Sequence, residues 1–162
     1  MRSLMDAEKD RNYMEIALEE ARKAYAINEV PIGAVIVYRD QIIGRGYNRR
    51  NTDKSTLAHA EILAMEEAMA FIGDWRLEET TMYITLEPCP MCAGAIVQAR
   101  IPRVVLGAMN PKAGSAGSVV NLLNEPKFNH QVQVEYDMCH DACKAILQDF
   151  FKELREQKKG LR

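Results

Sequence analysis

A histidine, a glutamate and two cysteines are spaced as in a hydrolytic zinc site. The first two lie in His59-Ala60-Glu61, and the cysteines lie in Pro88-Cys89-Pro90-Met91-Cys92. Zinc binds thiolate sulfur and imidazole nitrogen, and a catalytic zinc keeps one of its four positions for water. Two cysteines and one histidine leave that fourth position open. The pattern therefore predicts a catalytic zinc site with His59, Cys89 and Cys92 as its ligands.

The glutamate gives this predicted metal site a catalytic group. Residues i and i+2 do not share a face of a regular helix, so we do not expect Glu61 to join His59 as a ligand. Its carboxylate can instead reach the open position beside the metal. Zinc lowers the pKa of its bound water to about 7, which makes hydroxide available at neutral pH. We therefore expect Glu61 to take the proton of that water and deliver it to the substrate.

A structural zinc site and a redox pair of cysteines are the two plainer interpretations of these residues. A redox pair does not need the upstream His-x-Glu, and a structural site normally closes its fourth position with another cysteine or histidine. Cys139 or Cys143 could supply that ligand, although free cysteine is commonly just a small buried apolar residue. Neither interpretation gives Glu61 a role, so the catalytic one is preferred.

Alternating helices and strands are predicted to position these residues. In chain order they are a helix around 14–25, strands at 32–38 and 42–47, a helix at 60–71, a strand at 82–86, a helix at 91–99, strands at 104–106 and 132–136, and a helix at 141–157. This order predicts an α/β domain whose sheet is covered on both faces. His59 and Cys89 each stand next to a helix start, where free N–H groups favour thiolates and developing negative charge.

The bulk properties fit one globular domain over residues 1–162. Apolar residues make up 48% of the sequence and charged residues 27%, with a net charge of −2. This charge argues against a broad nucleic-acid-coating surface but allows a local basic patch. No apolar run is long enough to cross a membrane, and the polar N-terminal segment 1–11 does not resemble a secretory signal. We therefore expect a cytoplasmic protein, in which close cysteine pairs indicate metal or redox chemistry before disulfides.

The site residues and their flanks resemble a known family of enzymes. The pattern from His59 to Cys92 matches the His-x-Glu and Pro-Cys-x-x-Cys signature of zinc nucleobase deaminases, in the cytidine and deoxycytidylate deaminase superfamily. The flanking sequence is similar to the bacterial tRNA-specific adenosine deaminases over about residues 13–159. The segments that carry this similarity are Glu29-Val30-Pro31-Ile32-Gly33-Ala34-Val35, Ala58-His59-Ala60-Glu61, Trp75-Arg76-Leu77, the stretch 85–95, Phe128-Asn129-His130 and the stretch 150–155.

The resemblance implies a three-layer α/β/α sandwich with a five-stranded mixed sheet, as in cytidine deaminases. It also implies a homodimer with one zinc ion per subunit, which converts adenosine to inosine at the wobble position of a tRNA anticodon. Zinc-bound hydroxide would attack the flipped base while Glu61 shuttles protons. By position, Asn48, Ala60 and Pro88 would bind the substrate base.

The loop that follows the strand at 104–106 departs from the family pattern in two places. Asn110 stands where many relatives carry an acidic residue, and the glycine-rich stretch is thinned to Ala113-Gly114-Ser115-Ala116-Gly117. A role for a carboxylate at position 110 therefore does not carry over. The same holds for any contact that needs close backbone approach at Ala113.

Basic and aromatic side chains are available to hold an RNA strand. Lys152 and Arg155 recur at helical spacing, so they share one face of the last predicted helix. Either charge could equally belong to an ordinary solvated surface, and the RNA role depends on the resemblance. Phe150 and Phe151 point in different directions on a helix, so one is expected in the core and the other at a nucleotide or a dimer interface. The residues predicted to contact RNA are Lys112, Phe150, Lys152 and Arg155.

Two rival functions share part of these features. A deaminase of a free base or nucleoside, of the guanine or cytosine type, would share the metal motif without needing a basic C-terminal helix. A non-catalytic, zinc-stabilised RNA-binding module would have no use for Glu61. The sequence therefore favours a tRNA adenosine deaminase, with the free-base deaminase as the alternative.

Overall fold

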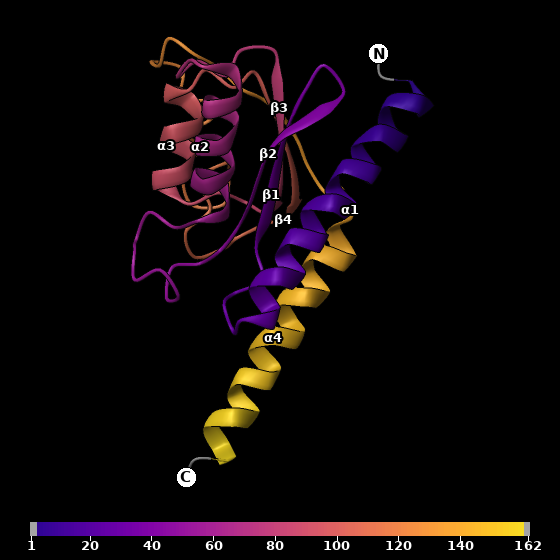
Figure 1. The fold of residues 1–162 in the computed structure, drawn as a ribbon, viewed down its shortest axis with the longest axis vertical. Helices are drawn as coiled ribbons and strands as arrows, with labels where there is room; N and C mark the ends of the chain where they lie inside the picture. Colours follow the sequence, from indigo (N-terminus) through magenta and orange to yellow (C-terminus); the bar gives the residue numbers. More distant parts are fainter. Residues whose placement is uncertain (1–2, 161–162) are drawn as a thin grey trace.

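A five-stranded mixed sheet lies between two layers of helices in the computed structural model, which describes residues 3–160 (Figure 1). The ends of the predicted domain, residues 1–2 and 161–162, lie outside the described residues. The strands are β1 (Gly33–Tyr38), β2 (Gln41–Tyr47), β3 (Thr80–Leu86), β4 (Arg103–Ala108) and β5 (Gln133–Glu135), and the helices are α1 (Leu4–Ala26), α2 (Ala60–Ile72), α3 (Pro90–Gln98) and α4 (His140–Gly160).

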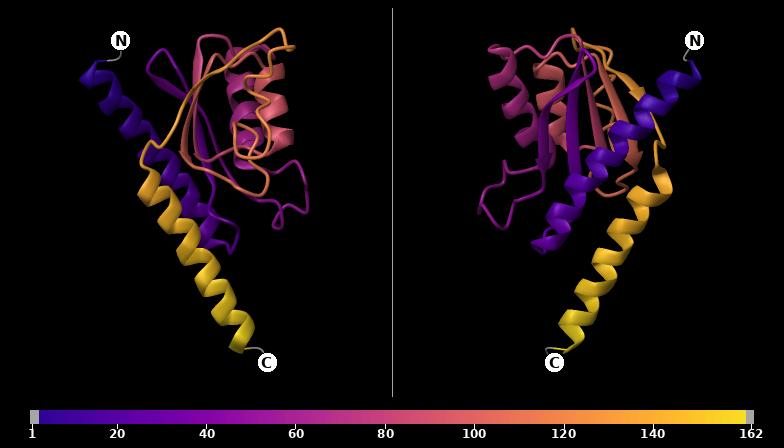
Figure 2. Two further views of the ribbon diagram at one scale, coloured as in Figure 1. Left: turned by 180° about the vertical axis from the view of Figure 1, so that it is seen from behind. Right: turned by 45° about the vertical axis from the view of Figure 1, so that its right-hand side comes forward.

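The strand order β2-β1-β3-β4-β5 combines antiparallel and parallel pairing. Strand β1 pairs antiparallel with β2 and β3, whereas β3, β4 and β5 pair parallel. Helices α2 and α3 cover one face of the sheet, and α1 with the first turns of α4 covers the other (Figure 2). The predicted three-layer α/β/α fold with its cytidine-deaminase-like mixed sheet is confirmed.

The two faces of the sheet feed separate hydrophobic cores, because successive strand residues point to opposite sides. On β1, Ala34 and Ile36 pack in the core under α2 and α3, while Val35 and Val37 pack in the core under α1. All four side chains are buried. The central strands therefore carry near-continuous apolar runs, as expected for a sheet covered on both faces.

Two glycines on β2 allow α2 to lie unusually close to the sheet. A Cβ atom at Gly44 would come within 2.2 Å of the Ala64 carbonyl oxygen, and one at Gly46 within 2.2 Å of the Ala60 carbonyl oxygen. A side chain at either position would therefore push α2 outward. The distance between the sheet and the first turn of α2, which carries Glu61, therefore depends on these glycines.

Helix α1 begins about ten residues before the start that the apolar periodicity predicts. Residues 4–9 are exposed, so they leave no apolar pattern in the sequence. The helix is instead started by a capping box, in which the Ser3 side chain accepts the Asp6 backbone N–H at 3.1 Å and the Asp6 carboxylate accepts the Ser3 N–H at 3.3 Å. In the sequence, the pair Ser3-x-x-Asp6 is the pattern that indicates this earlier helix start.

Helix α4 runs along the sheet at its start and then projects beyond it (Figure 2). Only Cys143 and Phe150 of this helix are buried. None of the helices within residues 3–160 combines the length and apolar character needed to span a membrane.

Candidate active site

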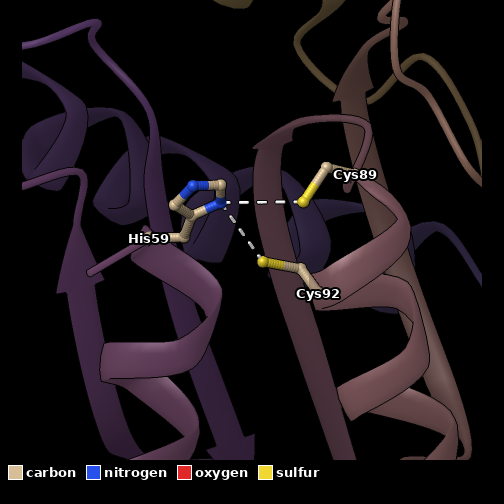
Figure 3. Close-up of side chains that lie close together, drawn as sticks. All are labelled: His59, Cys89 and Cys92. Atoms are coloured by element: carbon tan, nitrogen blue, oxygen red, sulfur yellow. Dashed lines mark hydrogen bonds between the residues drawn. The ribbon is translucent and has the colours of Figure 1, made fainter. Parts of the chain in front are cut away.

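Two helix starts bring the predicted metal ligands together. His59 is the N-cap residue of α2, Cys89 is the N-cap residue of α3, and Cys92 lies in the first turn of α3. Their side chains point toward one another across the gap between the two helices (Figure 3). The His59 Nδ1 atom lies 3.7 Å from Cys89 Sγ and 3.5 Å from Cys92 Sγ.

This donor set fits a zinc ion. Tetrahedral coordination with ordinary Zn–S and Zn–N bond lengths separates a nitrogen and a sulfur ligand by about 3.6 Å. The observed separations of 3.7 and 3.5 Å lie on either side of that value. Within residues 3–160, these three side chains form the one group of His, Cys, Asp or Glu spaced to hold a metal ion. A tetrahedral ion bound here would keep one position open.

The pKa values of the two cysteines at this site are shifted in opposite directions. A hydrogen bond from Cys92 lowers the pKa of Cys89 to about 4, with a further contribution from His59. The same hydrogen bond, together with burial, raises the pKa of Cys92. The hydrogen bond with Cys89 also raises the pKa of His59. These shifts favour the thiolate form of Cys89, which is the form that binds a metal ion.

Glu61 lies beside the ligands without belonging to their group. It is only 4% exposed and lines the cavity together with His59 and Cys89. Burial raises the pKa of its carboxyl to about 7. The structure thus places Glu61 on the lining of the same cavity as His59 and Cys89, and its role in proton transfer stays a prediction.

A cavity of about 400 Å³, a size typical of small-molecule sites, is lined by His59 and Cys89 of the candidate metal site. Leu147 and Phe151 of α4 also line it. Apolar side chains form much of the remaining surface, namely Val30, Ile32, Leu86 and Met109. Polar groups come from the loop after β2, with Asn48 and Arg50, and from the loop after β4, with Asn110 and Lys112; Glu87 lines the cavity as well.

The three residues predicted to bind a base differ in their access to the cavity. Asn48 and Ala60 line it. The Asn48 side chain donates to the Val30 carbonyl at 3.2 Å and accepts the Arg50 N–H at 3.1 Å, which leaves one N–H and further acceptor capacity for a ligand. Pro88 is buried and is not among the lining residues; its carbonyl accepts the Ser115 N–H at 2.8 Å.

The aromatic pair on α4 separates into one core residue and one cavity residue. Phe150 is 4% exposed and packs edge-on against Tyr25, with ring centroids 5.5 Å apart. This burial contradicts the prediction of Phe150 as an RNA contact. Phe151 is 41% exposed and lines the cavity.

A groove continues from the cavity along α4. It shares Lys112 and Phe151 with the cavity and then passes the predicted Lys152 and Arg155. Lys144 also lines it, and sequence analysis missed this residue. The signal was present, since Lys144 precedes Lys152 by eight residues and therefore shares its helix face.

Two buried carboxylates hold the loops that border the cavity, and one of them, Glu87, also lines it. Glu87 accepts backbone N–H groups from Asn110 at 2.9 Å, Ala116 at 2.9 Å and Ser118 at 3.0 Å, as well as the Ser118 hydroxyl. Burial raises the pKa of Glu87, but these hydrogen bonds outweigh it and hold the pKa below its usual value. Sequence analysis gave this residue no role, because an isolated acidic residue carries no sign of its burial.

The first loop is held in the same manner by Glu29, which is 1% exposed. Its carboxylate accepts the backbone N–H of Thr52 at 2.8 Å and that of Asn51 at 3.3 Å. The segment that follows Asn48 is therefore fixed from behind, on the side away from solvent.

The departures from the family pattern in the second loop have a local explanation. The Asn110 side-chain oxygen accepts the N–H groups of Lys112 and Ala113, both at 3.2 Å, so an amide forms this turn without a carboxylate. Close backbone approach occurs at Gly114, where a Cβ atom would come within 2.1 Å of Glu87 Oε1. Ala113 is thus tolerated because the crowded position is the next one.

The second cysteine pair does not reach the metal cluster. Cys143 is fully buried in the core under α1, and Cys139 packs against the same core. Burial raises the pKa of Cys143 to about 12, as expected for a thiol in apolar surroundings. The structure therefore removes these residues as candidates for a fourth ligand.

Known proteins match nearly all of the chain. The MafB19-like deaminase family matches residues 8–155. A tRNA-specific adenosine deaminase of Bacillus subtilis (strain 168) is 50% identical over 153 residues, which cover 94% of this chain and 95% of the relative. The tRNA-specific adenosine deaminase of Haemophilus influenzae is 42% identical over 161 residues, which cover 96% and 93%.

Solved structures give the same picture. A structure from work on A-to-I editing by tRNA:A34 deaminases at the wobble position of transfer RNA superposes with a TM-score of 0.81 at 41% identity, covering 84% of this chain and 99% of that one. A guanine deaminase from Nitrosomonas europaea superposes with a TM-score of 0.75 at 24% identity, covering 86% and 83%. The second likeness concerns the fold alone.

Proposed function

This chain belongs to the tRNA-specific adenosine deaminases, within the MafB19-like deaminases, and we propose that it hydrolyses adenosine to inosine at the wobble position of a tRNA anticodon. The observation that carries the proposal is the pairing of the His59, Cys89 and Cys92 cluster with a buried Glu61 at the base of a cavity. A structural metal site would gain nothing from a carboxylate in that position.

The residues of the cavity have separate roles in this proposed reaction. Zinc held by His59, Cys89 and Cys92 would supply a water of lowered pKa as the nucleophile. Water adds to C6 of adenine and ammonia leaves. Glu61 takes one proton of the attacking water and passes it to the ring nitrogen, which keeps it in inosine. It then moves the second water proton from the new hydroxyl on C6 to the amine, which leaves as ammonia. Asn48 orients the base through its remaining N–H and acceptor capacity, and the apolar walls exclude bulk water.

The substrate base has to leave its stack to enter this cavity, so the flanking strand needs its own support. The groove along α4 supplies it. Lys112 stands where cavity and groove meet, and Lys144, Lys152 and Arg155 follow along the groove. Phe151 provides an exposed ring on which a neighbouring base can stack, an interaction that tolerates many sequences.

An anticodon stem-loop with a wobble adenosine tests the proposal directly. The purified protein is incubated with this RNA and, separately, with free adenosine, guanine and cytidine. We expect inosine in the stem-loop and no turnover of the free compounds. Turnover confined to a free base would contradict the tRNA substrate and favour a guanine- or cytosine-type deaminase, while leaving the metal chemistry in place.

Charge reversal in the groove is expected to weaken RNA binding. Lys152→Glu combined with Arg155→Glu removes two phosphate partners. The plot of log binding constant against log salt concentration should therefore become shallower, with a slope smaller in magnitude by about 1.4 for a single strand. Filter binding at several salt concentrations measures this change, with metal content unaltered. Lys9→Glu with Arg39→Glu makes the same charge change outside the groove and serves as the control. Equal RNA affinity of both double variants would show that this face of α4 is ordinary solvated surface with no role in RNA binding.

We further propose a cytoplasmic homodimer with one zinc ion per subunit. Large apolar side chains that lie exposed outside the cavity support a second subunit, among them Phe71, Trp75 and Val119 at 61%, 54% and 55% exposure. Sedimentation equilibrium should give twice the chain mass of 18.4 kDa. A monomer at micromolar concentration would contradict the dimer without affecting the proposed reaction.

A further inference from the structure

The Glu87 carboxylate lies between the metal-binding segment and the second cavity loop. It is 1% exposed and sits two residues before Cys89. Its four hydrogen-bond donors all come from residues 110–118 of one loop. A carboxylate has about four acceptor sites, so the loop satisfies all of them.

No cationic side chain shares this charge. Among residues 3–160, no Lys, Arg or His forms an ion pair with Glu87, so backbone N–H groups and one hydroxyl alone compensate the buried carboxylate. Movement of the loop would leave a buried charge without partners, which is strongly unfavourable. The buried Glu87 carboxylate therefore stabilises the observed conformation of the loop, and the loop supplies the hydrogen bonds that the carboxylate needs.

Further contacts make the loop and the metal-binding segment one unit. The Ser115 N–H donates to the Pro88 carbonyl at 2.8 Å, directly beside Cys89. Gly114 gives the loop the room to pass over Glu87, because any side chain there would collide with the carboxylate. The Tyr136 hydroxyl holds the far side by donating to the Ala116 carbonyl at 2.9 Å.

We infer that Glu87 is a positioning residue, which holds loop 110–118 in its substrate-binding form before RNA arrives, and that Glu29 does the same for the loop after Asn48. The catalytic consequence rests on the proposed function. Each loop carries cavity-lining residues, Lys112 on one and Arg50 on the other. A loop without its anchor has to be ordered at the moment of binding, and that entropy cost weakens substrate binding more than it slows chemistry.

Glu87→Gln and Glu29→Gln test the inference as a reciprocal pair. Glutamine keeps the size of the side chain but turns half of its acceptor capacity into an N–H donor that faces backbone N–H groups. Amide exchange followed by NMR should show faster exchange at Ala116 and Ser118 in the first variant only, and at Thr52 in the second only. The sheet amides should keep their protection. Glu78→Gln, an exposed change of the same kind, should alter neither loop.

The kinetic readout separates positioning from general stability. With the anticodon stem-loop, we expect Glu87→Gln to raise KM at least tenfold, to change kcat less than threefold, and to keep zinc content at the wild-type level. Unchanged exchange at Ala116 and Ser118, or lost protection throughout the sheet, would overturn the inference. If Glu87→Gln does not fold, Ser118→Ala removes one donor and should speed exchange of the same loop. Exchange needs no substrate, so wild-type protein that is inactive on the stem-loop refutes the proposed function and leaves the anchoring inference to the exchange data.

Discussion

Glu61→Gln is expected to keep a full complement of zinc and to lose roughly 10²–10⁴-fold in kcat, the range that general acid–base catalysis contributes. The amide matches the carboxylate in size, so it fits the same buried position, where the native side chain is 4% exposed. It cannot take a proton of the attacking water or pass one to the leaving amine. Glu61→Ala should behave in the same way, with zinc retained and turnover lost.

Two measurements on the same sample check this expectation. Atomic emission gives the zinc content per chain, and single-turnover formation of inosine gives the rate of the chemical step. Glu66→Gln makes the same change at an exposed position of α2 and should leave both values unchanged. Zinc loss in the Glu61 variants would show that Glu61 is a ligand or a support of the cluster.

Cys92→Ala is expected to lose both zinc and activity, because it removes one of only three protein ligands. Changes in the outer shell of a metal site already cost about 10–100-fold in affinity, and the loss of a ligand should exceed that range. Cys143→Ala is a matched control, since both thiols are fully buried but only Cys92 faces the cluster. Both substitutions leave a small internal cavity and should destabilise the fold by similar amounts. A difference in zinc content between the two variants therefore reports the loss of a metal ligand.

The same experiment can overturn the ligand assignment. Replacing Cys139 and Cys143 together by alanine should leave the zinc content unchanged. Loss of zinc in that double variant, with zinc retained in Cys92→Ala, would place the metal at the other cysteine pair.

The grouping of His59, Cys89 and Cys92 could be predicted from the sequence because short motifs fix much of their mutual geometry. His59 and Glu61 are two residues apart at a helix start, and the cysteines are three apart at another, so each pair needs only local structure to be placed. Parallel pairing of β3 with β4 and the packing of α2 and α3 on one face complete the arrangement. The resemblance to a known family then supplied the sheet.

The residues that sequence analysis missed depend on long-range packing. Glu87 reaches its loop donors across 23 to 31 positions, and nothing near it in the chain marks it as buried. Phe150 and Phe151 are adjacent and chemically identical, and the sequence does not show that Phe150 is the ring that packs against Tyr25 of α1. Pro88 was assigned to the substrate by position, yet its carbonyl is engaged by Ser115.

The close approach of α2 to β2 has a consequence for how this protein tolerates mutation. No residue of β2 lines the cavity, and Gly44 and Gly46 face the back of the helix that carries Glu61. A single added methyl group at either glycine would shift that helix, and a displacement of about 1 Å in a catalytic group can cost on the order of 100-fold in rate. We therefore expect loss-of-function alleles on this strand as well as at the predicted zinc ligands. The positions that are sensitive to mutation are therefore expected to include the glycines of β2 behind α2, in addition to the residues that line the cavity.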